Sequence, residues 1–296
     1  MVIAASAVGP DVGGSDVVGI YRVDGPDSFT VVADIGEFSI NNPPDTSFFV
    51  PSGVQYALET YRGGFLVTDG HHNRVYRVTL DGEITELMAF GNIVPTGLAV
   101  RGNTIYMAEA GPVPHLPENG KVVKFGPNST TATEVASGSR LLVDVEFGRG
   151  RTLYALSQGV WNGEAEGSPA LPNSGALVKV NRDGTFTVVF DGLNQPTSLE
   201  FIGTTAYVVT LAGRSGGSRT SRVHPTASRV KQPGRAAGDR ARAPSSQRGT
   251  ARTGSAREDE RRHPLPPELI EGHVTSVLHV MFGARSCWRA APERPA

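Results

Sequence analysis

The chain has 296 residues and a formal net charge of −1 at pH 7, but residues 1–212 carry 12 Lys and Arg against 22 Asp and Glu, whereas residues 213–296 carry 16 against 7. This asymmetry indicates two pieces of different character. A single cysteine excludes an internal disulfide, and no apolar run approaches the roughly 20 residues of a membrane-spanning helix.

The first piece contains a repeat. Each copy has an alternating apolar strand, a turn with glycine, and an aromatic residue that opens a second strand. The copies cover 53–69, 95–111, 142–159 and 196–213. Their aromatic residues are separated by 41, 48 and 53 residues and are Phe65, Tyr106, Tyr154 and Tyr207.

A second hairpin follows three of these copies. Its centres include the Asp-Gly pairs of "LDGE" and "RDGT", which strongly favour a tight β-turn. These hairpins are expected over 74–88, 121–136 and 176–190, with an earlier one over 19–34. Four antiparallel strands in about 40–50 residues is the period of a β-propeller blade. The sequence therefore predicts an all-β fold built from such blades.

The repeat pattern is incomplete at both ends of the first piece. On the alignment of the copies, Met1 falls inside a second strand, and the last copy stops after its second strand at Leu211. We therefore expect a partial propeller of four-stranded blades over 1–212, with no further strand pair in the tail.

The second piece, 213–296, is rich in Arg, Ser, Gly and Pro and poor in apolar residues. Such a composition predicts a disordered tail, with a short helix over 266–282. We interpret it as an out-of-frame segment; the alternative is a basic anion-binding arm. Nucleic acid is not expected as a partner, because the tail has only Phe282 and Trp288 to stack on bases.

The first piece resembles the ScyD/ScyE family of bacterial β-propellers, which lies near the NHL-repeat and gluconolactonase-like propellers. The resemblance rests on "GVQYALETYRGGFLVTDGHHNRVYRVTLDGEITEL", "NIVPTGLAVRGNTIYMAEAG" and "QPTSLEFIGTTAYVVT". It implies six blades and an exported, extracellular protein, although the chain begins without the basic region of a signal peptide. It also implies that the gluconolactonase-like relatives hydrolyse lactones with a metal ion on the propeller axis.

Acidic residues stand where the first strands should face inward. The alignment puts Gln55, Gly97, Asp144 and Ser198 in one column and Ala57, Ala99, Glu146 and Glu200 in the next. Carboxylates here, joined by Glu109, would suit Ca²⁺ or another divalent cation, which prefers several oxygen ligands. The alternative is that they cap strand ends or bind backbone amides in a wet channel.

The remaining candidates lie in turns and loops. In "TDGHHNRV", we expect His71 and His72 in a turn, with Asp69 and Asn73 bonded to local backbone. Long inserts over 110–121 and 157–176 should form a binding rim with 41–53, and Trp161 is its exposed aromatic residue. Alternatively, these loops only cover the edge of the blades.

Two functions follow from these patterns. The first is a non-catalytic propeller that binds a small molecule or a protein at one face. The alternative is a divalent-metal-dependent, lactonase-like hydrolase that uses the inward carboxylates. The candidate residues are Gln55, Asp69, Glu109, Asp144, Glu146, Trp161 and Glu200.

Overall fold

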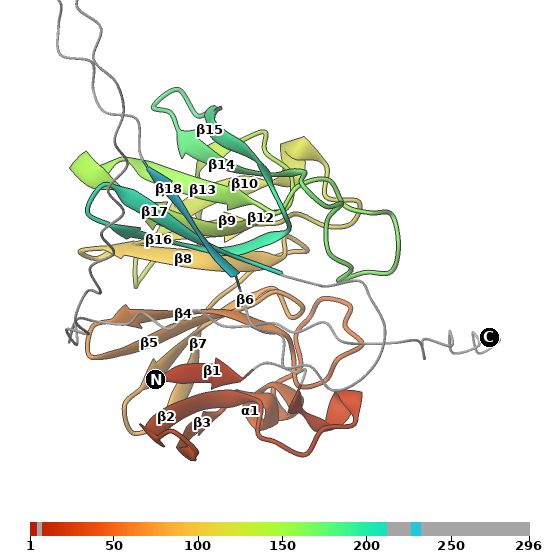
Figure 1. Cartoon of the computed structure of the whole chain (residues 1–296). Helices are drawn as coiled ribbons and strands as arrows, with labels where there is room; N and C mark the ends of the chain where they lie inside the picture. The colour runs from red at the N-terminus through yellow and green to blue at the C-terminus, as the bar shows by residue number, and fades with distance from the viewer. Residues whose placement is uncertain (5–7, 212–225, 232–296) are drawn as a thin grey trace, which may run out of the picture. The chain divides into compact units, whose positions relative to one another are not determined.

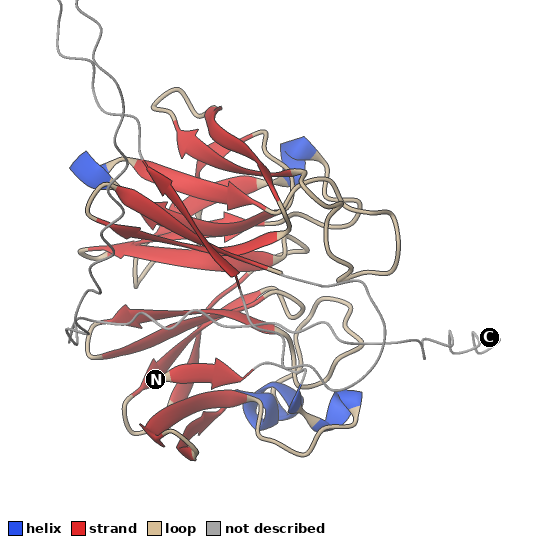
Figure 2. Cartoon of the chain, in the orientation of Figure 1, coloured by secondary structure: helices blue, strands red, loops and turns tan. Residues whose placement is uncertain are grey.

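The computed structural model describes residues 1–4, 8–211 and 226–231, and almost all of the regular structure in this part is antiparallel β-sheet (Figures 1 and 2). Five sheets follow one another along the chain, and we call them blades 1 to 5. The predicted fold class is confirmed: the sheets are arranged as propeller blades.

Blades 2 to 4 each have four strands. Blade 2 contains β4 (Gln55–Tyr61), β5 (Gly64–Asp69), β6 (Arg74–Thr79) and β7 (Ile84–Ala89). Blade 3 contains β8 (Pro95–Arg101), β9 (Thr104–Glu109), β10 (Lys121–Phe125) and β11 (Thr133–Ser137). Blade 4 contains β12 (Leu142–Phe147), β13 (Leu153–Ser157), β14 (Gly175–Val180) and β15 (Phe186–Leu193).

The other two blades have three described strands each. Blade 1 contains β1 (Val2–Ala4), β2 (Gly19–Gly25) and β3 (Ser28–Asp34), and it is followed by α1 (Ile35–Asn41). Blade 5 contains β16 (Pro196–Ile202), β17 (Thr205–Thr210) and β18 (Thr226–Lys231). Short 3-10 helices lie at Pro10–Val12, Pro117–Asn119 and Arg149–Arg151.

The predicted hairpins match these strands, and their turns have the expected backbone. Each of the turns "LDGE", "RGNT", "GRGRT", "RDGT" and "IGTT" has a glycine with positive φ; these are Gly82, Gly102, Gly150, Gly184 and Gly203. Since this region of backbone space favours glycine, the turn residues fixed the hairpins locally.

One short segment of the tail is described, and it forms a single strand rather than a strand pair. Thr226–Lys231 forms β18, which pairs antiparallel with β17 from Thr205↔Lys231 to Thr210↔Thr226. The free edge of β17 offers backbone donors and acceptors, and these accept a strand whatever its composition. The rest of the tail, including the helix expected over 266–282, lies outside the described residues.

The apolar cores lie between neighbouring blades. In β5, Val67 shares a core with Ile20 of blade 1 and Ile35 of α1. The adjacent Leu66 shares a different core with Ile105 and Met107 of blade 3. Successive residues of a strand point to opposite faces, so one strand serves two cores. This explains why every residue of β5 is buried.

The first strands of consecutive blades pack against one another: β4 against β8, β8 against β12, and β12 against β16. A side chain at Gly97 on β8 would collide with Asp144 on β12, so glycine permits this close approach. Carboxylates on these strands are therefore brought close together. In the described residues, no helix is long and apolar enough to cross a membrane.

Candidate functional site

Four carboxyl groups and one tyrosine gather on the first strands of three blades. We call this group the acidic cluster; it comprises Tyr56 and Glu59 on β4, Asp144 and Glu146 on β12, and Glu200 on β16. Two hydrogen bonds join the strands that carry it. The Leu199 N–H donates to Asp144 Oδ2 at 2.7 Å, and the Tyr56 hydroxyl donates to the Thr197 carbonyl at 3.1 Å.

The cluster holds its carboxyl groups in an unfavourable environment for charge. Burial raises the pKa of Asp144 to about 7 and that of Glu146 to about 8, and the charges of Glu200 and Glu59 add to both shifts. Burial likewise raises the pKa of Glu59 to about 7 and raises that of Glu200. None of the four forms an ion pair with a described basic side chain.

Three of the four carboxyl groups accept hydrogen bonds from backbone amides, and Glu59 accepts one from the Thr60 hydroxyl. Asp144 accepts from the N–H groups of Val145 and Leu199, Glu146 from that of Phe147, and Glu200 from that of Phe201. These bonds lower each pKa but do not offset the burial. The arrangement matches the alternative raised from the sequence, that these carboxylates bind backbone amides.

A divalent cation does not fit the described side chains of the cluster. Such an ion needs several ligands around one point. In the part of the chain that the structure describes, no group of three or more His, Cys, Asp or Glu side chains is placed to hold a metal ion. The described side chains of the cluster therefore do not supply the three or more ligands of a metal site.

The structure brings only some of the sequence candidates together. Asp144, Glu146 and Glu200 share the cluster, and sequence analysis missed Glu59 and Tyr56. The signal for Glu59 was its place two residues beyond Ala57 on an alternating strand. Gln55 does not join, because the pairing of β4 with β5 shifts between Gln55 and Leu58.

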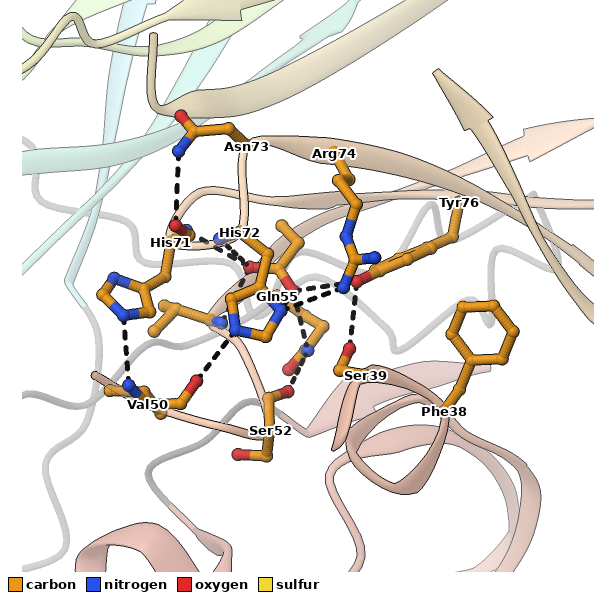
Figure 3. Close-up of polar contacts among 12 residues, drawn as sticks. Phe38, Ser39, Val50, Ser52, Gln55, His71, His72, Asn73, Arg74 and Tyr76 are labelled. Atoms are coloured by element: carbon orange, nitrogen blue, oxygen red, sulfur yellow. Dashed lines mark hydrogen bonds and ion pairs between the residues drawn. The ribbon is translucent and has the colours of Figure 1, made fainter. Parts of the chain in front are cut away.

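Gln55 belongs instead to a buried polar network centred on Asp69 (Figure 3). Asp69 is fully buried, and its Oδ1 accepts from the backbone N–H groups of Val54, His71 and His72 at 2.9, 3.2 and 2.9 Å. Its Oδ2 accepts from the Tyr76 hydroxyl at 3.2 Å and from Gln55 Nε2 at 3.4 Å. The expected turn at His71 and His72, with Asp69 bonded to local backbone, is confirmed.

The network ties the turn of blade 2 to the preceding segments. His72 Nε2 lies 2.9 Å from the Val50 carbonyl, and burial lowers the pKa of His72, which favours the neutral ring. The Arg74 guanidinium donates to the Asn42 carbonyl at 2.8 Å, and Tyr76 shares a 2.9 Å bond with Ser39 of α1. Figure 3 shows the side chains of His72, Arg74, Tyr76 and Ser39 turned toward one another. Such a network fixes loop geometry.

The two long inserts contact each other. His115 in the loop after β9 packs edge-on against Trp161 in the loop after β13, with ring centroids 6.2 Å apart. Trp161 also forms an isolated backbone bridge with Ala170. The residue is partly buried, although it was expected to be exposed, and its indole N–H has no hydrogen-bond partner among the described residues. The third predicted rim segment contacts blade 2 instead, through Phe49 and His71.

Glu109 lies apart from the acidic cluster. It ends β9 and stands directly opposite Lys121 of β10 in the strand register. The charges that act on Glu109 are those of Lys121 and Glu134, and none of them belongs to the cluster. Among the described residues, Glu109 is thus placed with Lys121 and Glu134 and not with Asp144.

Comparison with known proteins gives a fold likeness and no more. No family model and no curated protein matches the chain. A gluconolactonase from Xanthomonas campestris is similar in structure, with a TM-score of 0.43 and 16% identity over 60% of this chain and 62% of that one. The virginiamycin B lyase of Staphylococcus aureus has a TM-score of 0.38 and 14% identity over 60% of this chain and 56% of that one. The chain thus spans about three fifths of the length of these structures, and the similarity is too low to transfer an activity.

Proposed function

We propose that this chain is a binding propeller that takes a positively charged ligand at the acidic cluster. One observation carries the proposal: four partly buried carboxyl groups from three blades lie near enough for their charges to act on one another, without a described basic partner. A cation placed among them would offset both the burial penalty and their mutual repulsion. The ligand class is an ammonium or guanidinium group, on a small molecule or on a protein side chain.

Keeping these groups costs stability in the free protein. A glutamine or an apolar residue at the same positions would fill the space without the electrostatic penalty. Binding sites commonly carry such a penalty, since the same groups that destabilise the fold stabilise a ligand. The cluster is therefore better explained by ligand binding than by packing.

The sequence resemblance supports the same interpretation. Proteins of the ScyD/ScyE type are the relatives that the repeat suggests, and we propose that this chain is an exported binding propeller of that kind. The lactonase-like alternative depends on a metal ion, and the described residues offer no group of three or more His, Cys, Asp or Glu side chains to hold it. No observation favours that second function.

The test is a calorimetric titration of the full chain at pH 8 with putrescine, a small dication, beside 1,4-butanediol and succinate. We expect saturable binding of putrescine only, at least tenfold weaker in the double variant Glu146→Gln, Glu200→Gln. The control is Glu83→Gln, an exposed residue of the hairpin between β6 and β7. Equal binding of putrescine by the double variant and the wild type would refute the proposal.

Proton release gives an independent readout. Because their pKa values are raised to about 7 and 8, Asp144 and Glu146 are partly protonated at pH 7. A bound cation favours the ionised form, so binding at pH 7 should release protons to the buffer. Calorimetric titrations in two buffers of different ionisation enthalpy measure how many protons are released per ligand bound. A value of zero would contradict binding at these groups.

A further inference from the structure

A groove of about 340 Å³ lies between the end of β7 and the outer strands of blade 3. One side is apolar and includes Met88, Phe90 and Ile93. The other side carries Glu109, Lys121 and Glu134, which come from β9, β10 and β11. The groove has the size of a site for a small ligand and combines an apolar wall with a few polar groups, as such sites do.

Glu109 is the unusual residue of this groove. Only 5% of the residue is exposed, yet no described residue donates a hydrogen bond to its carboxylate. Burial raises the pKa of Glu109 to about 7, while the charge of Lys121 lowers it and that of Glu134 raises it. Buried carboxylates are normally paired or hydrogen bonded. Because the oxygens of Glu109 are not among the fully buried atoms that lack a partner, they open to the groove and can accept from a donor bound there.

Lys121 does not supply that donor. Although it is opposite Glu109 in the register, its ammonium group donates to Glu134 Oε2 at 2.8 Å. Glu134 is held there by a second bond, in which the Ser137 hydroxyl donates to its other oxygen at 2.8 Å. The ammonium group of Lys121 is thus bonded to Glu134 and not to Glu109. When Glu109, Lys121 and Glu134 are all ionised, the groove has a net charge of −1.

We propose that this groove binds a small primary amine with an apolar body, whose ammonium group donates to Glu109. The apolar part would pack on Met88, Phe90 and Ile93, and the ammonium group would complete the hydrogen bonding of the buried carboxylate. A carboxylic acid of the same size would be repelled by Glu109 and Glu134. An alcohol would donate only an uncharged hydrogen bond. This site goes beyond the acidic cluster and does not rest on it.

The experiment titrates n-hexylamine into the full chain at pH 8, where its ammonium group, like that of lysine, stays charged. Saturation-transfer NMR and calorimetry follow the binding, with n-hexanol and hexanoate as matched probes. We expect saturable binding of the amine, at least tenfold weaker binding of the alcohol, and none of the acid. Butylamine should bind more weakly than hexylamine, because it buries less apolar surface.

Three variants locate the site. Glu109→Gln keeps the shape of the side chain and should weaken hexylamine binding at least tenfold. Lys121→Met removes the competing cation, so it should strengthen binding severalfold. Glu83→Gln, outside the groove in the β6–β7 hairpin, should leave hexylamine binding unchanged. Circular dichroism checks that each variant is folded.

The outcomes are decisive. Loss in Glu109→Gln together with gain in Lys121→Met supports the site. The proposal is overturned by unchanged affinity in Glu109→Gln, by hexanoate binding as tightly as hexylamine, or by the absence of saturable amine binding to the folded wild type. The last result would mean that water is the donor to Glu109.

Discussion

Asp69 and Glu146 both carry a carboxyl group, but their surroundings in this protein differ. Asp69 is fully buried, and five hydrogen bonds satisfy its two oxygens. Glu146 in the acidic cluster has one backbone amide and acidic neighbours. Asp69 is thus part of the structure of blade 2, whereas Glu146 destabilises the protein in the absence of a ligand.

Replacement of Glu146 should show how much its carboxyl group destabilises the free protein. Its raised pKa means that the native state keeps a proton which the unfolded chain releases above its ordinary value of 4.5. The free energy of unfolding should therefore fall as the pH rises from about 4.5 to about 8. Glu146→Gln removes this loss, so it should stabilise the protein by roughly 1–2 kcal/mol at pH 8 and have little effect at pH 5.

Urea unfolding at both pH values measures the difference. The control is Glu83→Gln, whose side chain is exposed. A stabilisation that is the same at pH 5 and pH 8 would contradict the electrostatic explanation, since a packing effect does not follow the titration.

Asp69→Ala should have the opposite effect. It leaves three backbone N–H groups without their acceptor and leaves the Tyr76 hydroxyl bonded to Ser39 alone, at a cost of roughly 3–5 kcal/mol. Asp81→Ala, at an exposed hairpin position, is the matched control and should cost under about 0.5 kcal/mol. Chemical unfolding of the two variants compares them; similar losses would mean that Asp69 is not central to the network.

At the scale of elements, sequence patterns predicted the hairpins well because local rules govern them. Strand alternation places one residue toward each core, and Asp-Gly turns need positive φ at glycine, as at Gly82 and Gly184. The helix α1 was not predicted. It begins after Asp34, which accepts from the Glu37 N–H, and it is held by burial of Ile35 and Gly36.

The acidic cluster was only partly predictable for a related reason. Alternation shows that Asp144, Glu146 and Glu200 share a face, but not how near that face lies to the next blade. The shifted register after Gln55 also sends Gln55 to Asp69 and leaves Glu59 in the cluster. Contacts between blades depend on packing that no single strand encodes.

Two hairpin glycines separate local strain from contact between blades. Both Gly82 and Gly102 have positive φ, so alanine at either costs roughly 1–2 kcal/mol. At Gly102 an added Cβ meets nothing, whereas at Gly82 it collides with the Val32 carbonyl oxygen of β3. We expect Gly82→Ala to cost about 1–3 kcal/mol more than Gly102→Ala in urea unfolding. Equal costs would mean that blade 1 moves aside freely.

At the scale of the whole described unit, each apolar core joins neighbouring blades. The cores pair blade 1 with blade 2, blade 2 with blade 3, blade 3 with blade 4, and blade 4 with blade 5. Stability in such an array is close to a sum of neighbour terms, and local opening can start in one blade. The hydrogen bond from Tyr56 to Thr197 is different, because it joins blade 2 to blade 5 across 141 residues.

Tyr56→Phe tests whether this bond couples distant blades. It leaves the Thr197 carbonyl without its donor and should cost about 1 kcal/mol. Exchange of backbone amide hydrogens should become faster in both β4 and β16, although only β4 carries the substitution. Tyr21→Phe is the matched control, because it removes a hydroxyl bond to Val17, only four residues away, and should quicken exchange only within blade 1. If Tyr56→Phe affects β4 alone, the blades are coupled only through their neighbours, and a ligand at the acidic cluster would have to supply the link between blades 2 and 5 itself.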